Sequence, residues 1–214
     1  CQSSSHYCKF YGGNKRSIVR RKRMKLQSLF ITPIMITKSV GHESLVDRLY
    51  EIKKQDEKGV PKSNIGGWHS HDELYKDEKF KQITGDILFN AKECFKHLEL
   101  QDNIDPELTG LWAIINPPGS RNTVHTHPYN FLSGVYYLKV PQKSGNLVFL
   151  DPRPQAEILS APVNKNASVH LTHSVSYEPK DNDLIFFPSW LQHEVKINNS
   201  NEDRIILSFN IMWG

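Results

Sequence analysis

The sequence has few cysteines and no long hydrophobic run. Its three cysteines, Cys1, Cys8 and Cys94, form neither a metal-binding spacing nor an even-numbered disulfide set. This pattern argues against a disulfide-stabilised fold and favours a reducing compartment, so we expect a cytoplasmic protein. Apolar stretches such as residues 184–187 and 205–207 are far shorter than the roughly 20 residues that a membrane-spanning helix needs. No membrane partner is expected.

Acidic residues are missing from the first 25 positions, which carry eight lysines or arginines. Such a basic segment could bind nucleic acid or an anionic surface. The simpler interpretation is that residues 1–23 are a disordered or non-native extension, and nucleic acid is not expected as a partner. The overall content of 38% hydrophobic and 23% charged residues is typical of a globular protein. We therefore expect one folded domain over residues 24–214.

Helical spacing is found in the first half of the chain and strand-like spacing in the second. Apolar residues recur every three or four positions over 43–57 and 78–100, which predicts two amphipathic helices within a supporting region of about 43–105. Residues 29–37 resemble an early strand. Beyond residue 108, short runs separated by turns predict an all-β barrel or sandwich over about 108–214. Its expected strands are 111–116, 132–140, 146–150, 167–176, 183–187, 194–197 and 204–212.

Three histidines in the β region have the spacing of metal ligands. His125 and His127 are two residues apart, so on an extended strand both side chains point to the same face. His193 follows the apolar run 184–187 and a bend. A second pair, His69 and His71, lies in a glycine-rich loop, and we expect no metal there because such a loop orients ligands poorly.

The last predicted strand has two chemically different faces. With a period of two, Arg204, Ser208 and Asn210 share one face, while the opposite face is apolar. If the polar face lines a barrel interior, the arginine is a buried cation that needs an anionic partner. A guanidinium suits a carboxylate because it can donate two parallel hydrogen bonds.

These residues, taken in order along the chain, resemble the putative 2-oxoglutarate-Fe(II) oxygenases related to prolyl hydroxylases. The resemblance extends from about residue 26 to the C-terminus. Any one of its motifs would be weak alone, whereas the ordered set is specific. The motifs are LFITP at 29–33, GGW at 66–68, HTHP at 125–128, LSGVYYL at 132–138, SGNL at 144–147, DPR at 151–153, FFPSWLQH at 186–193 and RIILSFN at 204–210.

The resemblance implies a double-stranded β-helix, the jelly-roll or cupin-like barrel, that holds Fe(II). It implies an enzyme that uses 2-oxoglutarate and O2, with ascorbate as a candidate further cofactor, and hydroxylates a substrate with release of succinate and CO2. His125 and His193 would bind the metal. The co-substrate would be held by Arg204, Tyr137, Asn116 and Ser208, and candidate residues of the substrate pocket are Trp190 and Asn210.

His127 departs from the family pattern, which has an acidic residue at this position. Three neutral imidazoles leave the iron at a charge of +2, and a dianionic co-substrate would neutralise it. His127 is therefore our third predicted ligand. Two alternatives remain: His127 could lie in the second shell of the metal, or Asp151 could complete the site from a neighbouring strand.

Two other functions fit part of the pattern. A cupin-type dioxygenase also uses three histidines, but it has no fixed need for an arginine on the strand after the last ligand. A non-catalytic ligand-binding β-barrel with a structural metal would normally have four ligands, and only three are identified here. The substrate is expected to be a small molecule or a peptide, and the sequence carries no motif for an oligomeric state.

Overall fold

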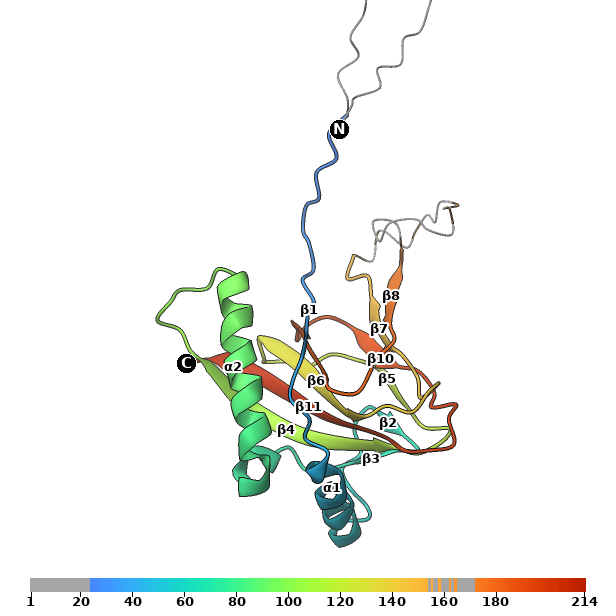
Figure 1. Cartoon of the computed structure of the whole chain (residues 1–214). Helices are drawn as coiled ribbons and strands as arrows, with labels where there is room; N and C mark the ends of the chain where they lie inside the picture. Colours follow the sequence, from blue (N-terminus) through green and yellow to red (C-terminus); the bar gives the residue numbers. More distant parts are fainter. Residues whose placement is uncertain (1–23, 154, 156–157, 159–161, 163, 165–171) are drawn as a thin grey trace, which may run out of the picture. The chain divides into compact units, whose positions relative to one another are not determined.

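A computed structural model describes residues 24–214 except 154, 156–157, 159–161, 163 and 165–171. The chain divides into two units, residues 1–31 and 32–214. In the first unit, the described residues 24–31 contain no helix or strand. The extension expected at 1–23 lies outside the described residues. All described helices and strands belong to the second unit (Figure 1).

Both predicted helices are confirmed, and each buries its apolar stripe. The helix α1 covers Ser44–Gln55, and α2 covers Lys81–His97. Two short 3-10 turns, η1 at Leu74–Lys76 and η2 at Glu78–Phe80, precede α2. The residues of α1 and α2 that are buried recur every three or four positions, as amphipathic helices require: Leu45, Leu49, Ile52, Ile83, Ile87, Ala91, Cys94 and Phe95.

The remaining elements form two antiparallel sheets. The major sheet has six strands in the order β1-β9-β6-β11-β4-β3, and the minor sheet has five in the order β2-β5-β10-β7-β8. This mainly β architecture confirms the predicted fold class. The strands are β1 Met35–Lys38, β2 Asn64–Ile65, β3 Trp68–His69, β4 Pro106–Asn116, β5 Arg121–His125, β6 Leu132–Lys139, β7 Leu147–Leu150, β8 Ser174–Tyr177, β9 Asp183–Pro188, β10 His193–Val195 and β11 Arg204–Trp213.

The predicted strand boundaries differ from the structure in several places, and β4 begins at Pro106 and not at residue 111. The early strand is confined to Met35–Lys38, beyond Pro33, which has no N–H to donate to a strand ladder. The strands β2, β3 and β5 were not predicted, because two of them have only two residues and β5 is mostly polar. The strand β8 begins at Ser174, and residues 167–171 of the predicted 167–176 lie outside the described part.

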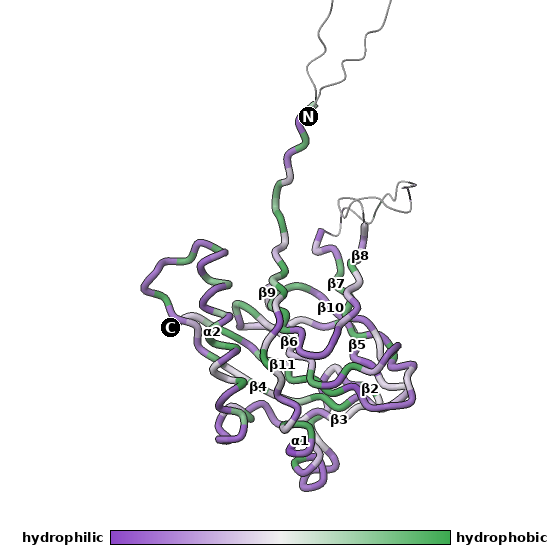
Figure 2. The backbone as a smooth tube through the Cα atoms, viewed as in Figure 1, coloured by the Kyte–Doolittle hydropathy of each residue, from purple (hydrophilic) through white to green (hydrophobic). Residues whose placement is uncertain are grey.

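The two faces of the major sheet belong to two different cores. One face packs against α1 and α2 through a core of hydrophobic side chains, with α2 against β4 (Figure 1). The other face meets the minor sheet in a second core that includes Trp112, Tyr137, Phe187 and Ile206. Figure 2 shows hydrophobic segments along β4, β6, β9 and β11 and hydrophilic connections between them. The candidate functional side chains lie between the two sheets, on this second face and on the facing side of the minor sheet.

Candidate metal centre

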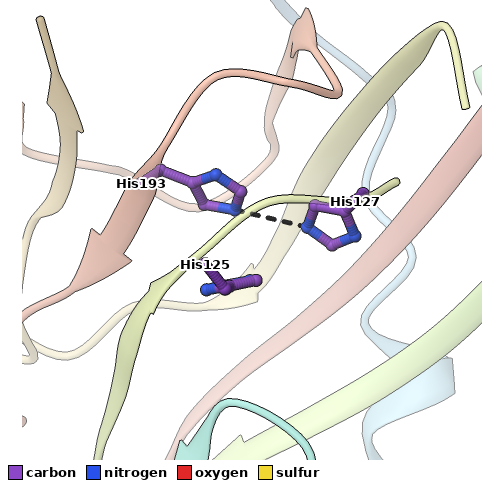
Figure 3. Close-up of side chains that lie close together, drawn as sticks. All are labelled: His125, His127 and His193. Atoms are coloured by element: carbon purple, nitrogen blue, oxygen red, sulfur yellow. Dashed lines mark hydrogen bonds between the residues drawn. The ribbon is translucent and has the colours of Figure 1, made fainter. Parts of the chain in front are cut away.

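Three histidines meet where two strands of the minor sheet lie side by side. His125 is the last residue of β5 and His193 the first of β10, and these two residues are directly paired in the sheet. His127 lies two residues beyond β5, in a loop held by its backbone N–H, which donates to the Ser189 carbonyl at 2.9 Å. Each histidine offers one ring nitrogen, and these three nitrogens all lie within 4.8 Å of one another (Figure 3).

The spacing of these nitrogens suits a single metal ion. The Nε2 atoms of His127 and His193 are 3.3 Å apart. Two imidazole nitrogens bound at adjacent octahedral positions, each at about 2.1 Å from the ion, would be separated by about 3 Å. The ring centroid of His125 lies 4.3 Å from that of His193 and 5.1 Å from that of His127. The group therefore fits one face of an octahedral ion, with positions left open for other ligands.

Backbone carbonyls orient two of the three rings. The Nδ1–H of His125 donates to the Thr123 carbonyl at 2.7 Å, and the Nδ1–H of His193 donates to the Leu191 carbonyl at 2.9 Å. Each of these bonds leaves Nε2 as the unprotonated nitrogen, which is the arrangement typical of metal-bound histidine.

His127 is held less firmly, because the described residues give its Nδ1 no hydrogen-bond partner. Its Nε2–H donates to His193 Nε2, and a metal ion would take the place of this proton.

The histidines are neutral because burial disfavours their charged form and because the rings of His127 and His193 lie beside other histidines. Burial, followed by the neighbouring histidines, lowers the pKa of His127 from 6.5 to about 3. Burial and the charge of His125 lower the pKa of His193 to about 4, and burial lowers the pKa of His125. Neutral imidazole is the form that binds metals, so the site is ready for a cation at neutral pH.

A cavity of about 730 Å³ opens onto the three histidines. Its size is within the range of small-molecule sites. Tyr137, Ser208 and Asn210 line it, as the expected polar face of β11 requires. Arg204 and Asn116 are on the same sheet face but are completely buried beyond the cavity wall.

Trp190 is not part of this cavity, which corrects its expected place in the substrate pocket. Its side chain is 55% exposed. The chain turns after β9, where the Leu191 N–H donates to the Pro188 carbonyl at 2.9 Å. Leu191, which is 2% exposed, takes the inward position and belongs with Phe187 to the core between the two sheets.

Four buried polar atoms without partners gather around Arg204. Its Nη1 donates to the carbonyls of Ser144 at 2.5 Å and Gly145 at 3.2 Å, while Nε and Nη2 have no hydrogen-bond partner. The Ser144 hydroxyl and the Asn116 side-chain oxygen are also buried and unsatisfied, and Asn116 is paired with Arg204 in the sheet. Burial lowers the pKa of Arg204 to about 10, so the guanidinium remains charged at neutral pH. A buried cation with two free donors fits a carboxylate ligand.

Asp151, the alternative third ligand, lies outside the histidine group. Its carboxylate accepts hydrogen bonds from Nε and Nη2 of Arg153 at 3.0 and 2.7 Å. The ion pair with Arg153 lowers the pKa of Asp151. The carboxylate of Asp151 therefore pairs with Arg153 within the same turn.

A second wall of the cavity was missed by sequence reasoning. His69, Ser70, His71 and Asp72 all line the cavity, because β3 pairs with β4 and carries this segment to the barrel interior. Asn122 lines it as well. The closely spaced His69 and His71 were the only sequence signal, and they were considered as metal ligands. In the structure neither belongs to the histidine group at the metal centre.

The comparisons with known proteins agree with this geometry. Residues 110–210, which include the three histidines and Arg204, match the model of the family described as putative 2OG-Fe(II) oxygenase. No curated protein sequence matches the chain.

Several solved structures share the fold. The non-haem alpha-ketoglutarate-dependent epimerase SnoN from nogalamycin biosynthesis aligns with a TM-score of 0.61 at 13% identity, over 85% of this chain and 78% of that one. A prolyl-4-hydroxylase from Pseudomonas putida aligns with a TM-score of 0.54 at 17% identity, over 85% and 92%. HygX from Streptomyces hygroscopicus, with nickel and 2-oxoglutarate bound, aligns with a TM-score of 0.55 at 14% identity, over 85% and 82%. Within the described residues, no helix has the length and apolar character needed to cross a membrane.

Proposed function

We propose that this chain is a 2OG-Fe(II) oxygenase and that it is a hydroxylase that binds Fe(II) through His125, His127 and His193; the family match over residues 110–210 and the histidine group support this. The observation that carries this proposal is the convergence of three neutral imidazoles on a cavity, together with a buried guanidinium beyond the cavity wall, two of whose nitrogens have no hydrogen-bond partner. When bound, iron and 2-oxoglutarate supply the oxidation: one oxygen atom of O2 enters the substrate C–H bond, the other enters succinate, and CO2 is released.

The residues of this chain supply ligands, orientation and a water-poor cavity. His125 and His193 present Nε2 atoms whose direction is fixed by backbone carbonyls. His127 replaces the acid common in the superfamily, so the protein ligands contribute no negative charge. A dianionic co-substrate would then balance the charge of the ion, and its binding would be favoured electrostatically.

The far end of the barrel is suited to the distal carboxylate of 2-oxoglutarate. Arg204 would donate through Nε and Nη2, and the Ser144 hydroxyl, which sequence reasoning did not identify, would add a third donor. Tyr137, a lining residue whose buried hydroxyl has a raised pKa, stays protonated and able to donate. Asn116 beside Arg204, and Ser208 on the cavity wall, complete the proposed co-substrate site.

We place the catalytic domain at residues 24–214 and propose a small-molecule or peptidyl substrate. Ascorbate would serve as a further cofactor. The scarcity of cysteine supports a cytoplasmic location, because free thiols persist in a reducing compartment.

One reconstitution experiment tests this function. The full chain is loaded with Fe(II) under anaerobic conditions, its metal content is measured, and succinate is quantified after addition of 2-oxoglutarate and O2. We expect one iron per chain and succinate formation that requires both additions. Iron binding with O2 consumption that is independent of 2-oxoglutarate would instead identify a cupin-type dioxygenase, and failure to retain iron would contradict both.

A further inference from the structure

The wall formed by His69 and the residues after it carries opposite charges that are not paired with each other. Lys62 and Asp72 both line the cavity and are exposed to it, and within the described part of the chain neither side chain has an ion-pair partner. His69 lies near both. After burial, which lowers the pKa of His69 most, Lys62 lowers this pKa and Asp72 raises it. A cation and an anion therefore flank one buried histidine.

His69 itself is prepared to accept a hydrogen bond from a molecule in the cavity. Its side chain is buried, and its Nδ1–H donates to the Ser70 carbonyl at 2.6 Å. The neutral ring is therefore protonated at Nδ1, which leaves Nε2 as an acceptor. The described residues offer this Nε2 no hydrogen-bond partner. A donor on the substrate can satisfy it.

A stack of three aromatic rings connects this wall to the metal centre. The His69 ring lies parallel to Trp112, with centroids 5.7 Å apart and an interplanar angle of 12°. The Trp112 ring in turn lies 5.6 Å from His127, at 29°. One indole ring therefore separates His69 from a proposed iron ligand. A substrate held at His69 can extend along Trp112 toward the metal centre.

On the basis of the function proposed above, we propose that this wall binds the charged end of a free α-amino acid. Asp72 pairs with its ammonium group, Lys62 pairs with its carboxylate, and His69 Nε2 accepts an N–H of the ammonium. The side chain lies along Trp112 and presents a carbon distant from the α-carbon to the metal. An internal residue of a peptide has neither charged group, so it leaves both side chains of this wall unpaired.

The test measures succinate formation by the Fe(II)-loaded full chain in the presence of each of the twenty common L-amino acids. We expect a subset with long side chains to stimulate turnover, while glycine and alanine do not, because they cannot span the indole. The N-acetyl derivative of the best stimulator lacks the ammonium and should act at least about tenfold more weakly, the scale expected for loss of a hydrogen bond to a charged group.

Variants of the wall make the test specific to these residues. Asp72→Asn and Lys62→Gln should each raise the half-saturating concentration of the free amino acid about tenfold. Asp72→Asn should not raise the half-saturating concentration of the N-acetyl derivative further, because this derivative lacks the ammonium group that pairs with Asp72. The matched control is Glu73→Gln, because Glu73 is adjacent but is exposed and paired with Lys76. This control should respond to the amino acid as the parent protein does.

Binding is measured separately from turnover by titrating the best stimulator, or each amino acid in turn if none stimulates, into the protein in a calorimeter. If 2-oxoglutarate is bound and converted to succinate but no amino acid binds or stimulates, the substrate assignment is wrong and the dioxygenase function stands. Equal responses to the free and N-acetylated amino acids, or equal shifts in Asp72→Asn and Glu73→Gln, would also overturn it. If 2-oxoglutarate is neither bound nor consumed, the proposed function fails, and amino-acid binding alone then decides this assignment.

Discussion

The two faces of β11 meet opposite environments. On one face, Ile205, Leu207, Phe209 and Ile211 are completely buried in the hydrophobic core on the side of the helices. On the other face, Ser208 and Asn210 line the cavity, and Arg204 is buried with two nitrogens unpaired. The same strand thus stabilises the fold with one set of alternate residues and carries the proposed chemistry with the other. Removing a residue from either face should affect one property and spare the other.

The largest expected effect is a loss of iron affinity at the metal centre. His193→Ala or His125→Ala removes one of three ligands, so iron affinity should fall by more than about 100-fold, beyond the effect typical of second-shell changes. The metal content after anaerobic loading and desalting measures this effect. The unfolding midpoint of the metal-free protein should change little. Full iron retention in both variants would exclude this cluster as the iron site.

Arg204→Ala should weaken 2-oxoglutarate binding by about 2 to 5 kcal/mol, the cost of truncating one partner of a buried charge pair. Iron binding should persist. The free energy of unfolding should not fall by a similar amount, because the arginine is incompletely paired without its ligand. Calorimetric titration of the iron-loaded protein with 2-oxoglutarate, next to urea unfolding, separates the two quantities. An unchanged affinity would contradict the co-substrate assignment.

A substitution on the apolar face should lower the stability of the protein and leave 2-oxoglutarate binding unchanged. Leu207→Ala is expected to lower the free energy of unfolding by about 2 to 5 kcal/mol, because it leaves a cavity beneath the helices. The affinity of the folded fraction for 2-oxoglutarate should equal that of the parent protein. Urea unfolding and the same titration test both parts, and a loss of affinity comparable to that of the arginine variant would mean that the two faces are not independent.

The smallest expected change is also the most informative one about the third ligand. His127→Asp introduces an acidic residue, as the oxygenases that the sequence resembles usually have at this position. We expect turnover to be retained or improved, whereas His127→Ala should reduce it. Succinate formation at saturating iron measures both variants. If aspartate and alanine were equally harmful, His127 would belong outside the first shell.

Sequence periodicity was sufficient where a whole face of an element is buried. It predicted α2, the mainly β second half of the chain and the alternation of β11, because burial imposes a regular pattern on such elements. The histidine spacing also identified the group that converges in the structure. The position of His127 beyond the end of β5 was not predicted, because a loop bond to Ser189 holds it.

Short elements were not predicted, because they form only through pairing with segments that are distant in the sequence. The strand β3 has two residues and exists because it pairs with β4, more than 40 positions away in the chain. No local pattern could therefore predict that His69 and Asp72 face the cavity. The exposure of Trp190 has a different origin, because with a period of two Leu191 and not Trp190 shares the inward face of Phe187.

The direct pairing of His125 with His193 has a mechanical consequence. The strand β10 has only three residues and joins β5 to β7 within the minor sheet. An ion held by both histidines would act as a cross-link between β5 and β10, and its binding energy would add to the cohesion of that sheet. Resistance to heat would then rise with metal loading, and chelation would first loosen the strands at the cavity mouth while the helical layer stayed intact.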